Sequence, residues 1–215
     1  MEKESDTNLK LDADLGAFFR ELVEETAEVS RSAPDGPLKE YVVGLLEDSA
    51  SKENAVQATV HQPLALLLAD AMAAEPAERF DRLRKTGDGI LLVGGLYRGH
   101  LQRAGVEDRY VVALGRRAYQ SASSLLDLPG GAVLLGGQSP CDILAELAQA
   151  FRDLMVFLRA VADTLVARAA RSASDLARLC EVWLADRSSH LGQLLRARGV
   201  MLDRALVGAD ARSRN

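Results

Sequence analysis

The sequence predicts an all-α protein, a multi-helix bundle of about seven to eight helices around one long central helix. Leucine and alanine dominate the apolar residues while aromatic residues make up only 5%, which favours helices over strands. Leucines recur at spacings of three and four between residues 140 and 170. No segment alternates apolar and polar residues in the way that a half-buried strand does.

The length of 215 residues allows a sizeable core without disulfides or metals, and we expect one helical domain over residues 12–200. Residues 1–11 are expected to form a flexible tail and residues 201–215 a flexible basic tail. The N-terminus lacks the regions of a signal peptide, and no apolar run approaches the roughly 20 residues that span a bilayer. We therefore expect a cytoplasmic protein without membrane contact.

The net charge of −5 is spread unevenly along the chain. Residues 1–60 carry a net charge of −8, whereas residues 151–215 carry +4. This asymmetry would let subunits or partners attract one another, or it reflects no more than two solvated faces. The sequence pI near 5.3 argues against nucleic acid as the main partner.

The first expected helix starts near residue 12, because Leu15, Phe18 and Leu22 recur at helical spacing. A group of acidic residues falls on its other side and is best explained as a solvated face: Glu21, Glu24, Glu25 and Glu28.

Prolines mark the starts of three further helices, because proline suits the first helical turn. They are Pro37, Pro63 and Pro76. Gly87 is placed to end the helix from Pro76 as a left-handed cap.

Two more helices are expected over residues 89–104 and 106–126. The apolar run 89–97 is compatible with a buried helix or a buried strand, and we favour the helix because no strand partner is evident. The helix over 106–126 carries a stripe of small residues, which would let the Gly94–Gly95 backbone approach closely. The stripe consists of Val111, Gly115, Ala118 and Ala122.

The central helix begins at Ser139 and Pro140, a cap and a first-turn proline. Its apolar residues are spaced 3,4,3,4,3,4, the pattern of three heptads. They are Leu144, Leu147, Phe151, Leu154, Leu158, Val161 and Leu165. This seam belongs either to an intrachain bundle or to an interface with a partner protein or a second copy. A last helix is expected over 174–198, ended by Gly199.

The familiar catalytic and metal-binding motifs are missing. The glycine-rich stretch 131–138 lacks the Lys and the Ser or Thr of a phosphate-binding loop. Ser139 lacks the second glycine of a nucleophile elbow, and Cys141 and Cys180 form neither a disulfide framework nor a zinc site. None of the three histidines is followed at i+3 or i+4 by an acidic residue or a second histidine that would form a metal pair. We expect no metal and no cofactor.

The best candidate site is a group of arginines and aromatic residues between positions 97 and 119. If the helices over 89–104 and 106–126 form a hairpin, these residues would converge on an anionic or aromatic ligand or an acidic partner surface. The candidates are Tyr97, Arg98, His100, Arg116, Arg117 and Tyr119. The alternative is a set of surface arginines whose stems cover apolar area.

The order of several segments resembles a family of all-helical bacterial proteins with no assigned activity. The segments are FFRELVEE, YVVGLL, HQPLALLLADAM, a glycine–tyrosine run and LARLCEVWLADRSSHLGQLLRARG. The resemblance implies a Gly87–Asp88 start, and a Tyr…Gly…Ala-Tyr pattern that runs from Tyr110 to Tyr119. It also implies a second aromatic residue at position 96, where this chain has Leu96. It implies the fold and no activity.

Three functions are therefore compatible with the sequence. The first is a non-catalytic interaction or scaffold protein that acts through helical faces, either as a monomer or as a homodimer. The second is a small-ligand sensor or binding protein with the Arg/Tyr pocket. The third is an enzyme of unrecognised type that uses Asp88, His100 or Cys141. The lack of catalytic constellations favours the first function.

Overall fold

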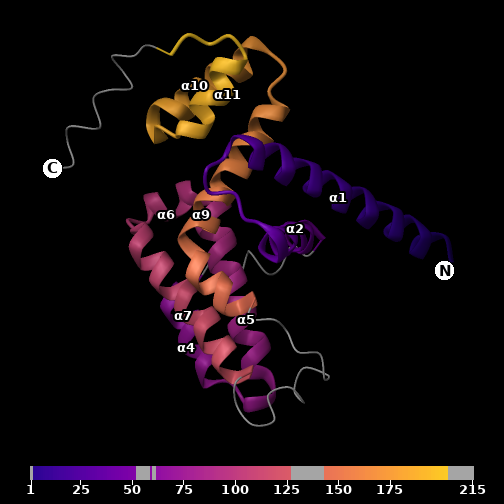
Figure 1. The fold of residues 1–215 in the computed structure, drawn as a ribbon, viewed down its shortest axis with the longest axis vertical. Helices are drawn as coiled ribbons and strands as arrows, with labels where there is room; N and C mark the ends of the chain where they lie inside the picture. The colour runs from indigo at the N-terminus through magenta and orange to yellow at the C-terminus, as the bar shows by residue number, and fades with distance from the viewer. Residues whose placement is uncertain (1, 52–58, 60–61, 127–142, 203–215) are drawn as a thin grey trace. The chain divides into compact units, whose positions relative to one another are not determined.

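The computed structural model describes residues 2–51, 59, 62–126 and 143–202, and over these ranges the protein is all-α (Figure 1). Nine helices and no strand are present in the described ranges. The apolar run 89–97, which the sequence left open between helix and strand, is helical. Among the described helices, none combines the length and the apolar character needed to cross a membrane.

The chain divides into two compact units, Met1–Arg159 and Ala160–Asn215, where the sequence predicts one domain over 12–200. The first helix, α1 (Glu2–Val29), also begins earlier than residue 12. No proline or glycine interrupts residues 2–15, so the sequence allows the helix to begin at Glu2.

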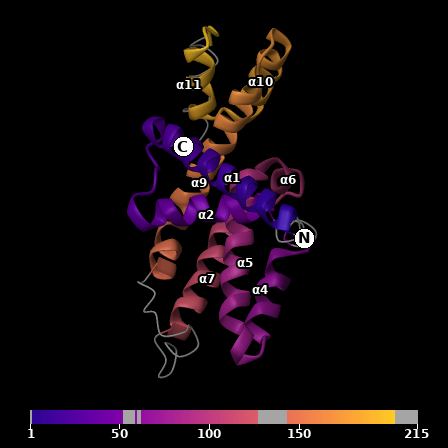
Figure 2. The same cartoon turned by 90° about the vertical axis from the view of Figure 1, so that its right-hand side faces the viewer.

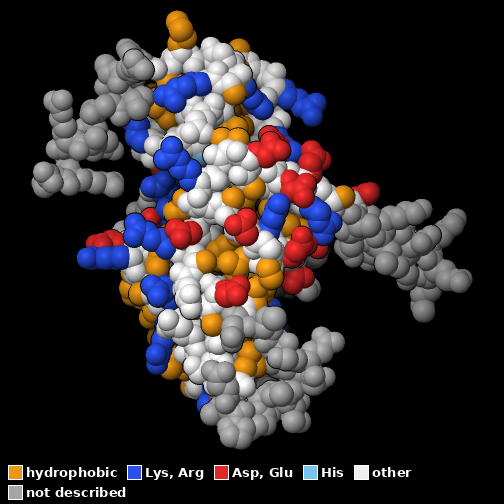
Figure 3. All heavy atoms as spheres, viewed as in Figure 1, with side chains coloured by type: hydrophobic (Ala, Val, Ile, Leu, Met, Phe, Trp, Pro, Cys, Tyr) orange, Lys and Arg blue, Asp and Glu red, His pale blue; other side chains and the backbone are white. Residues whose placement is uncertain are grey.

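Helix α1 packs against α2 (Gly36–Ser51) in the first unit. Gly36 is the first residue of α2 and has φ +51, a conformation that glycine adopts without strain. Apolar residues from both helices are fully buried, among them Leu22 and Val42. The acidic side of α1 is exposed as expected, and Figure 3 shows red acidic side chains gathered over α1 and α2.

Helices α4 (Leu64–Ala73), α5 (Pro76–Leu96) and α7 (Asp108–Leu126) lie side by side in the same unit (Figures 1 and 2). Pro76 occupies the first turn of α5, as predicted. Gly87 does not end this helix, and that prediction is wrong: α5 continues to Leu96. A short helix, α6 (Arg98–Arg103), follows after a break at Tyr97, so the expected helix 89–104 is in fact parts of two helices.

Close approach between helices explains why α5 and α7 contain glycines. A Cβ atom at Gly87 would lie 2.6 Å from the Tyr119 ring, and one at Gly94 would lie 3.0 Å from Val111. Since the positions that α5 and α7 bring together rise in number along one helix and fall along the other, the two helices are antiparallel. The predicted approach of Gly94 to the small-residue stripe is confirmed at Val111, while Gly115 instead accommodates the ring of Phe151.

Helix α9 (Ile143–Ala169) begins in the first unit and ends in the second. Six of its seven heptad residues are 3% exposed or less: Leu144, Leu147, Phe151, Leu154, Leu158 and Val161. Only Leu165, at 41%, is exposed. Burial of these six residues favours the first of the two alternatives, a seam that packs within the chain. Self-association or a partner at this seam is not supported by the structure.

Arg159 fastens α9 to both α5 and α7 within the first unit. Its two terminal nitrogens donate to the carboxylate of Asp108 at 2.7 and 2.8 Å, and its Nε donates to the Gly94 carbonyl at 3.0 Å. This two-pronged arrangement is the strong form of an arginine–carboxylate pair. The side chain of Arg159 is 17% exposed, so water screens the pair only in part.

The second unit contains α10 (Ala173–Asp186) and α11 (Ser189–Ala197), not the single helix expected over 174–198. Arg187 ends α10 with φ 53, and the hydroxyl of Ser188 caps α11. Gly199 follows α11 with φ +82, which confirms its predicted role as the helix stop. The core of this unit is made by a small set of buried residues: Ala167, Leu179, Trp183, Leu191 and Leu195.

Candidate functional site

The structure does not bring the six predicted site residues together. Tyr97, Arg98 and His100 lie at or in α6, where Tyr97 and His100 are exposed and Arg98 is half-buried. Arg116 and Arg117 are exposed on α7.

Tyr119 is fully buried, and it lies against Gly87 near the middle of α5, away from Tyr97 and α6. Ten helical positions separate Gly87 from Tyr97, a distance of about 15 Å. The predicted Arg/Tyr pocket is therefore wrong as one site, and Tyr119 belongs to a different cluster.

That cluster surrounds Asp88, a carboxylate that is 9% exposed. The hydroxyls of Tyr41 and Tyr119 both donate to its Oδ1, at 2.6 and 2.7 Å. A terminal nitrogen of Arg84 donates to its Oδ2 at 3.1 Å. Three donors from three helices thus satisfy one buried acid, as a buried charge requires.

The local sequence of α5 accounts for part of the cluster around Asp88. Asp81, Arg84 and Asp88 follow one another at spacings of three and four, which places them on one helical face. Arg84 therefore bonds Asp81 at 3.2 Å as well as Asp88. The other half comes from distant segments, because α2 supplies Tyr41 and α7 supplies Tyr119.

Burial raises the pKa of Asp88 above its ordinary value, and hydrogen bonds from the two tyrosines and the charge of Arg84 oppose that rise. The charge of Asp48, on α2, raises the Asp88 pKa further. Burial, followed by the Asp88 charge, also raises the pKa of both Tyr41 and Tyr119. Both phenols therefore stay protonated at neutral pH and remain donors to Asp88.

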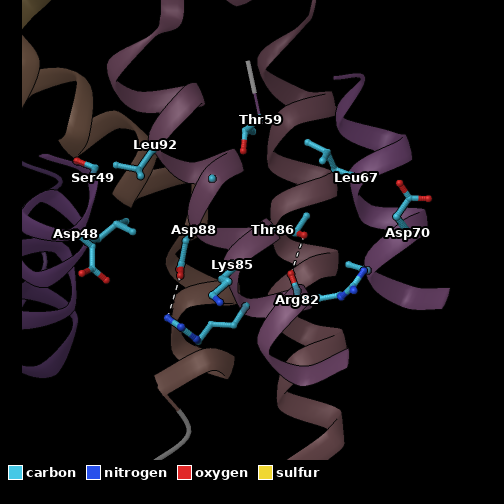
Figure 4. A pocket seen from close by; sticks show the side chains of 14 residues that line it. Asp48, Ser49, Thr59, Leu67, Asp70, Arg82, Lys85, Thr86, Asp88 and Leu92 are labelled. Atoms are coloured by element: carbon cyan, nitrogen blue, oxygen red, sulfur yellow. Dashed lines mark hydrogen bonds and ion pairs between the residues drawn. The ribbon is translucent and has the colours of Figure 1, made fainter. Parts of the chain in front are cut away.

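A cavity of about 520 Å³ opens beside this cluster, lined by residues of α2, α4 and α5 together with Thr59 (Figure 4). Its size lies within the range of small-molecule sites. Leu45, Ala71 and Leu92 give it a buried apolar lining, and Leu67 adds a half-buried side chain from α4.

Charged side chains complete the lining of the cavity (Figure 4). Arg82, Arg84, Lys85 and Asp88 come from α5, Asp48 from α2 and Asp70 from α4. The arrangement offers apolar surface next to several charged groups, which is the combination that holds a small amphipathic molecule.

Of the three residues considered for an enzyme, the structure describes Asp88 and His100, and these two lie in different surroundings. His100 is exposed on α6, and Asp88 is bonded to two tyrosines and an arginine instead. Cys141, Ser139 and the stretch 131–138 lie outside the described residues. Over the described ranges, no group of three or more His, Cys, Asp or Glu side chains is placed to hold a metal ion.

Sequence reasoning missed Tyr41 and Arg84. Tyr41 occupies an apolar stripe position in its helix, where an aromatic residue reads as core. The Asp–Arg–Asp spacing of Asp81, Arg84 and Asp88 is visible in the sequence and is a local signal that could have indicated Arg84.

Comparison with known proteins finds no match to a protein-family model, to a curated protein or to a solved structure. The resemblance to a family of helical bacterial proteins therefore stays a prediction.

Proposed function

We propose that the protein binds a small molecule in the cavity between α2, α4 and α5. The observation that carries this proposal is the cavity itself, whose volume is about 520 Å³ and whose wall includes the buried carboxylate of Asp88. This is the second of the three functions compatible with the sequence. Its proposed site is this cavity and no longer the Arg/Tyr group.

Two features support ligand binding at this place. The lining from Leu45 and Leu92 offers apolar contact, which drives association by removing ligand surface from water. Asp88 is held by Tyr41, Arg84 and Tyr119, so a ligand would meet a charged group whose position is already fixed. Preorganisation of this kind limits the entropy lost on binding.

The first function, a non-catalytic scaffold, has less support from the described residues. One of its motivations is the heptad seam of α9, and six of those seven residues are buried in the chain. A scaffold that acts through other helical faces stays a prediction, as does an enzymatic activity.

Native mass spectrometry of the protein purified gently from its own host tests the proposal. We expect the wild type to carry extra mass that is lost on denaturation. Leu67→Trp should abolish this extra mass, because Leu67 lines the cavity and the larger indole would fill it.

Leu66→Trp is the matched control, since Leu66 is the neighbouring residue of α4, is 58% exposed and does not line the cavity. It should retain the bound mass. A wild type of bare mass, or equal retention in both tryptophan variants, would contradict binding at this cavity.

A further inference from the structure

The two carboxylate oxygens of Asp88 are used differently. Oδ1 accepts hydrogen bonds from the hydroxyls of Tyr41 and Tyr119, at 2.6 and 2.7 Å. An ionised carboxylate has about four acceptor sites on its two oxygens, so these two bonds use the capacity of Oδ1. The bond that Oδ2 accepts from the described residues comes from Arg84, at 3.1 Å. Oδ2 is therefore the oxygen that can accept a further bond.

Arg84 lies beside Asp88 in the wall of the cavity. Both residues line it, and a dashed line in Figure 4 marks the bond that Asp88 accepts. An arginine has five N–H donors, and the two terminal nitrogens of Arg84 each donate one bond, to Asp88 and to Asp81. The side chain is 34% exposed. The guanidinium is therefore accessible and has further N–H groups for an acceptor of the ligand.

The ion pair between Asp88 and Arg84 offers an acceptor and a donor next to each other. The two opposite charges offset one another locally, and the bonded oxygen and nitrogen are 3.1 Å apart. A ligand group that can only accept, or only donate, bonds one half of this pair. A neutral group that carries an N–H and an acceptor side by side bonds both halves at once. This preference follows from the two paired groups themselves, whatever charges lie elsewhere in the wall.

Apolar surface lies one helical turn away from the ion pair. Leu92 is four positions beyond Asp88 in α5, so both side chains share a helical face, and both line the cavity. Leu45 from α2 and Leu67 from α4 extend the apolar lining. A ligand that bonds Asp88 can therefore place an apolar body against leucines of three helices.

From the ion pair and its apolar neighbours we infer that the ligand is a neutral amphipathic molecule with a primary carboxamide group. One amide N–H donates to Oδ2 of Asp88, the amide carbonyl accepts from Arg84, and the apolar body packs against the leucines. A primary amide has an N–H on the same side as its carbonyl oxygen, whereas a trans secondary amide has its N–H on the opposite side. The inference rests on the proposed function and names its ligand class.

Four probes that share one apolar chain test this pairing: octanamide, N-methyloctanamide, octanoate and octylammonium. Isothermal titration calorimetry of the full-length wild type at neutral pH should show octanamide binding about tenfold or more tightly than N-methyloctanamide. The methyl group replaces the N–H beside the carbonyl, and the cis form that would restore it is rare. Octanoate and octylammonium each bond one half of the ion pair and meet a like charge in the other half, so both should bind more weakly than octanamide.

Arg84→Met tests the contact to the amide carbonyl, since methionine has no N–H donor. The preference for octanamide over N-methyloctanamide should fall from about tenfold to less than about threefold. This ratio compares two ligands on one folded protein, so a loss of stability does not imitate its change, and circular dichroism confirms the fold. If the variant does not fold, the wild-type ratio decides alone. Arg116→Met, at an exposed position of α7 outside the cavity lining, is the control and should keep the tenfold preference.

The outcomes distinguish this inference from the proposed function. If N-methyloctanamide or a charged probe binds as tightly as octanamide and Leu67→Trp abolishes both, the cavity binds ligands but the carboxamide class is overturned. If no probe binds while the purified protein still carries a removable mass, the ligand class is wrong and ligand binding stands. If no probe binds and the wild type has bare mass, both fail.

Discussion

The buried carboxylate of Asp88 requires hydrogen-bond donors around it. Two tyrosine hydroxyls donate to the same carboxylate oxygen, and both phenols have a raised pKa that keeps their protons in place. A buried carboxylate left without such donors would destabilise the fold by several kcal/mol. The two hydroxyls are therefore structural necessities of the acid, whatever ligand the neighbouring cavity takes.

Tyr119→Phe removes one of these donors without changing the ring that packs against Gly87. We expect the free energy of unfolding to fall by about 1.5–3 kcal/mol, since the lost hydrogen bond goes to a charged and buried acceptor. Urea denaturation followed by circular dichroism measures the change. Tyr110→Phe, at a 44% exposed position of the same helix, should alter stability by less than about 0.5 kcal/mol.

The dependence of stability on pH reports the titration of Asp88. The groups that face it are Tyr41 and Asp48 from α2, Arg84 from α5 and Tyr119 from α7. Because the folded pKa is raised, the proton stabilises the folded state. This contribution is complete below the unfolded pKa of about 3.9 and is lost as pH rises through the folded pKa.

Wild type and Asp88→Asn should therefore be compared by urea denaturation between about pH 4 and pH 8. The unfolding free energy of the wild type, minus that of the variant, should decrease as pH rises and then become constant. A difference that increases with pH would show that the three hydrogen-bond donors outweigh burial and that the Asp88 pKa is lowered.

At the scale of elements, the contacts between α5 and α7 depend on the absence of side chains. A methyl group at Gly87 would lie 2.6 Å from the Tyr119 ring, so Gly87→Ala should displace the ring and lengthen the bond from Tyr119 to Asp88. We expect a loss of about 1–3 kcal/mol in unfolding free energy, the usual effect of overpacking. Urea denaturation measures it.

Gly99→Ala is the matched control in α6, because nothing lies within 4 Å of the added methyl group. It should be neutral, or more stable by up to about 1 kcal/mol, since alanine favours a helix over glycine. Equal destabilisation by both substitutions would mean that the α5–α7 approach is looser than the structure describes.

The example of Gly87 also shows what sequence can and cannot predict at this scale. Periodicity and the proline starts are local signals, so the all-helical class and the start of α5 at Pro76 were predictable. Gly87 does not end its helix but leaves room for the ring of Tyr119. That ring belongs to α7, 32 positions away in the chain, so the role of this glycine could not be predicted from local sequence. The tyrosines of the Asp88 cluster are equally remote, at separations of 47 and 31 positions.

The break between α10 and α11 is a second feature that the sequence did not predict, because it lies inside a continuous polar stretch. The expected helix over 174–198 breaks because Arg187 adopts a left-handed conformation, which is rare for a residue with a side chain. The arginine also lies over the Trp183 ring at 5.0 Å, a tertiary contact that favours its position. Ser188 was a local cap signal that could have indicated the break.

At the scale of the whole molecule, the division into two units gives each unit its own apolar interior. In the second unit Leu191 is 1% exposed and packs in the same cluster as Trp183, the one tryptophan of the sequence. In the first unit α5 and α7 pack together and bury apolar residues, among them Leu91 and Val111. Tryptophan fluorescence therefore reports the second unit, while circular dichroism reports helices of both.

We predict that the two signals separate when each unit is weakened in turn. Leu191→Ala should lower the fluorescence midpoint in urea strongly, because truncation of a buried leucine costs about 2–5 kcal/mol. Gly87→Ala should lower the circular dichroism midpoint and move the fluorescence midpoint less, since compact units with their own cores can unfold in separate steps. If each variant shifts both midpoints equally, the continuous helix α9 makes the chain one cooperative unit. The division into two units would then reflect where residues pack densely, but the two units would not unfold separately.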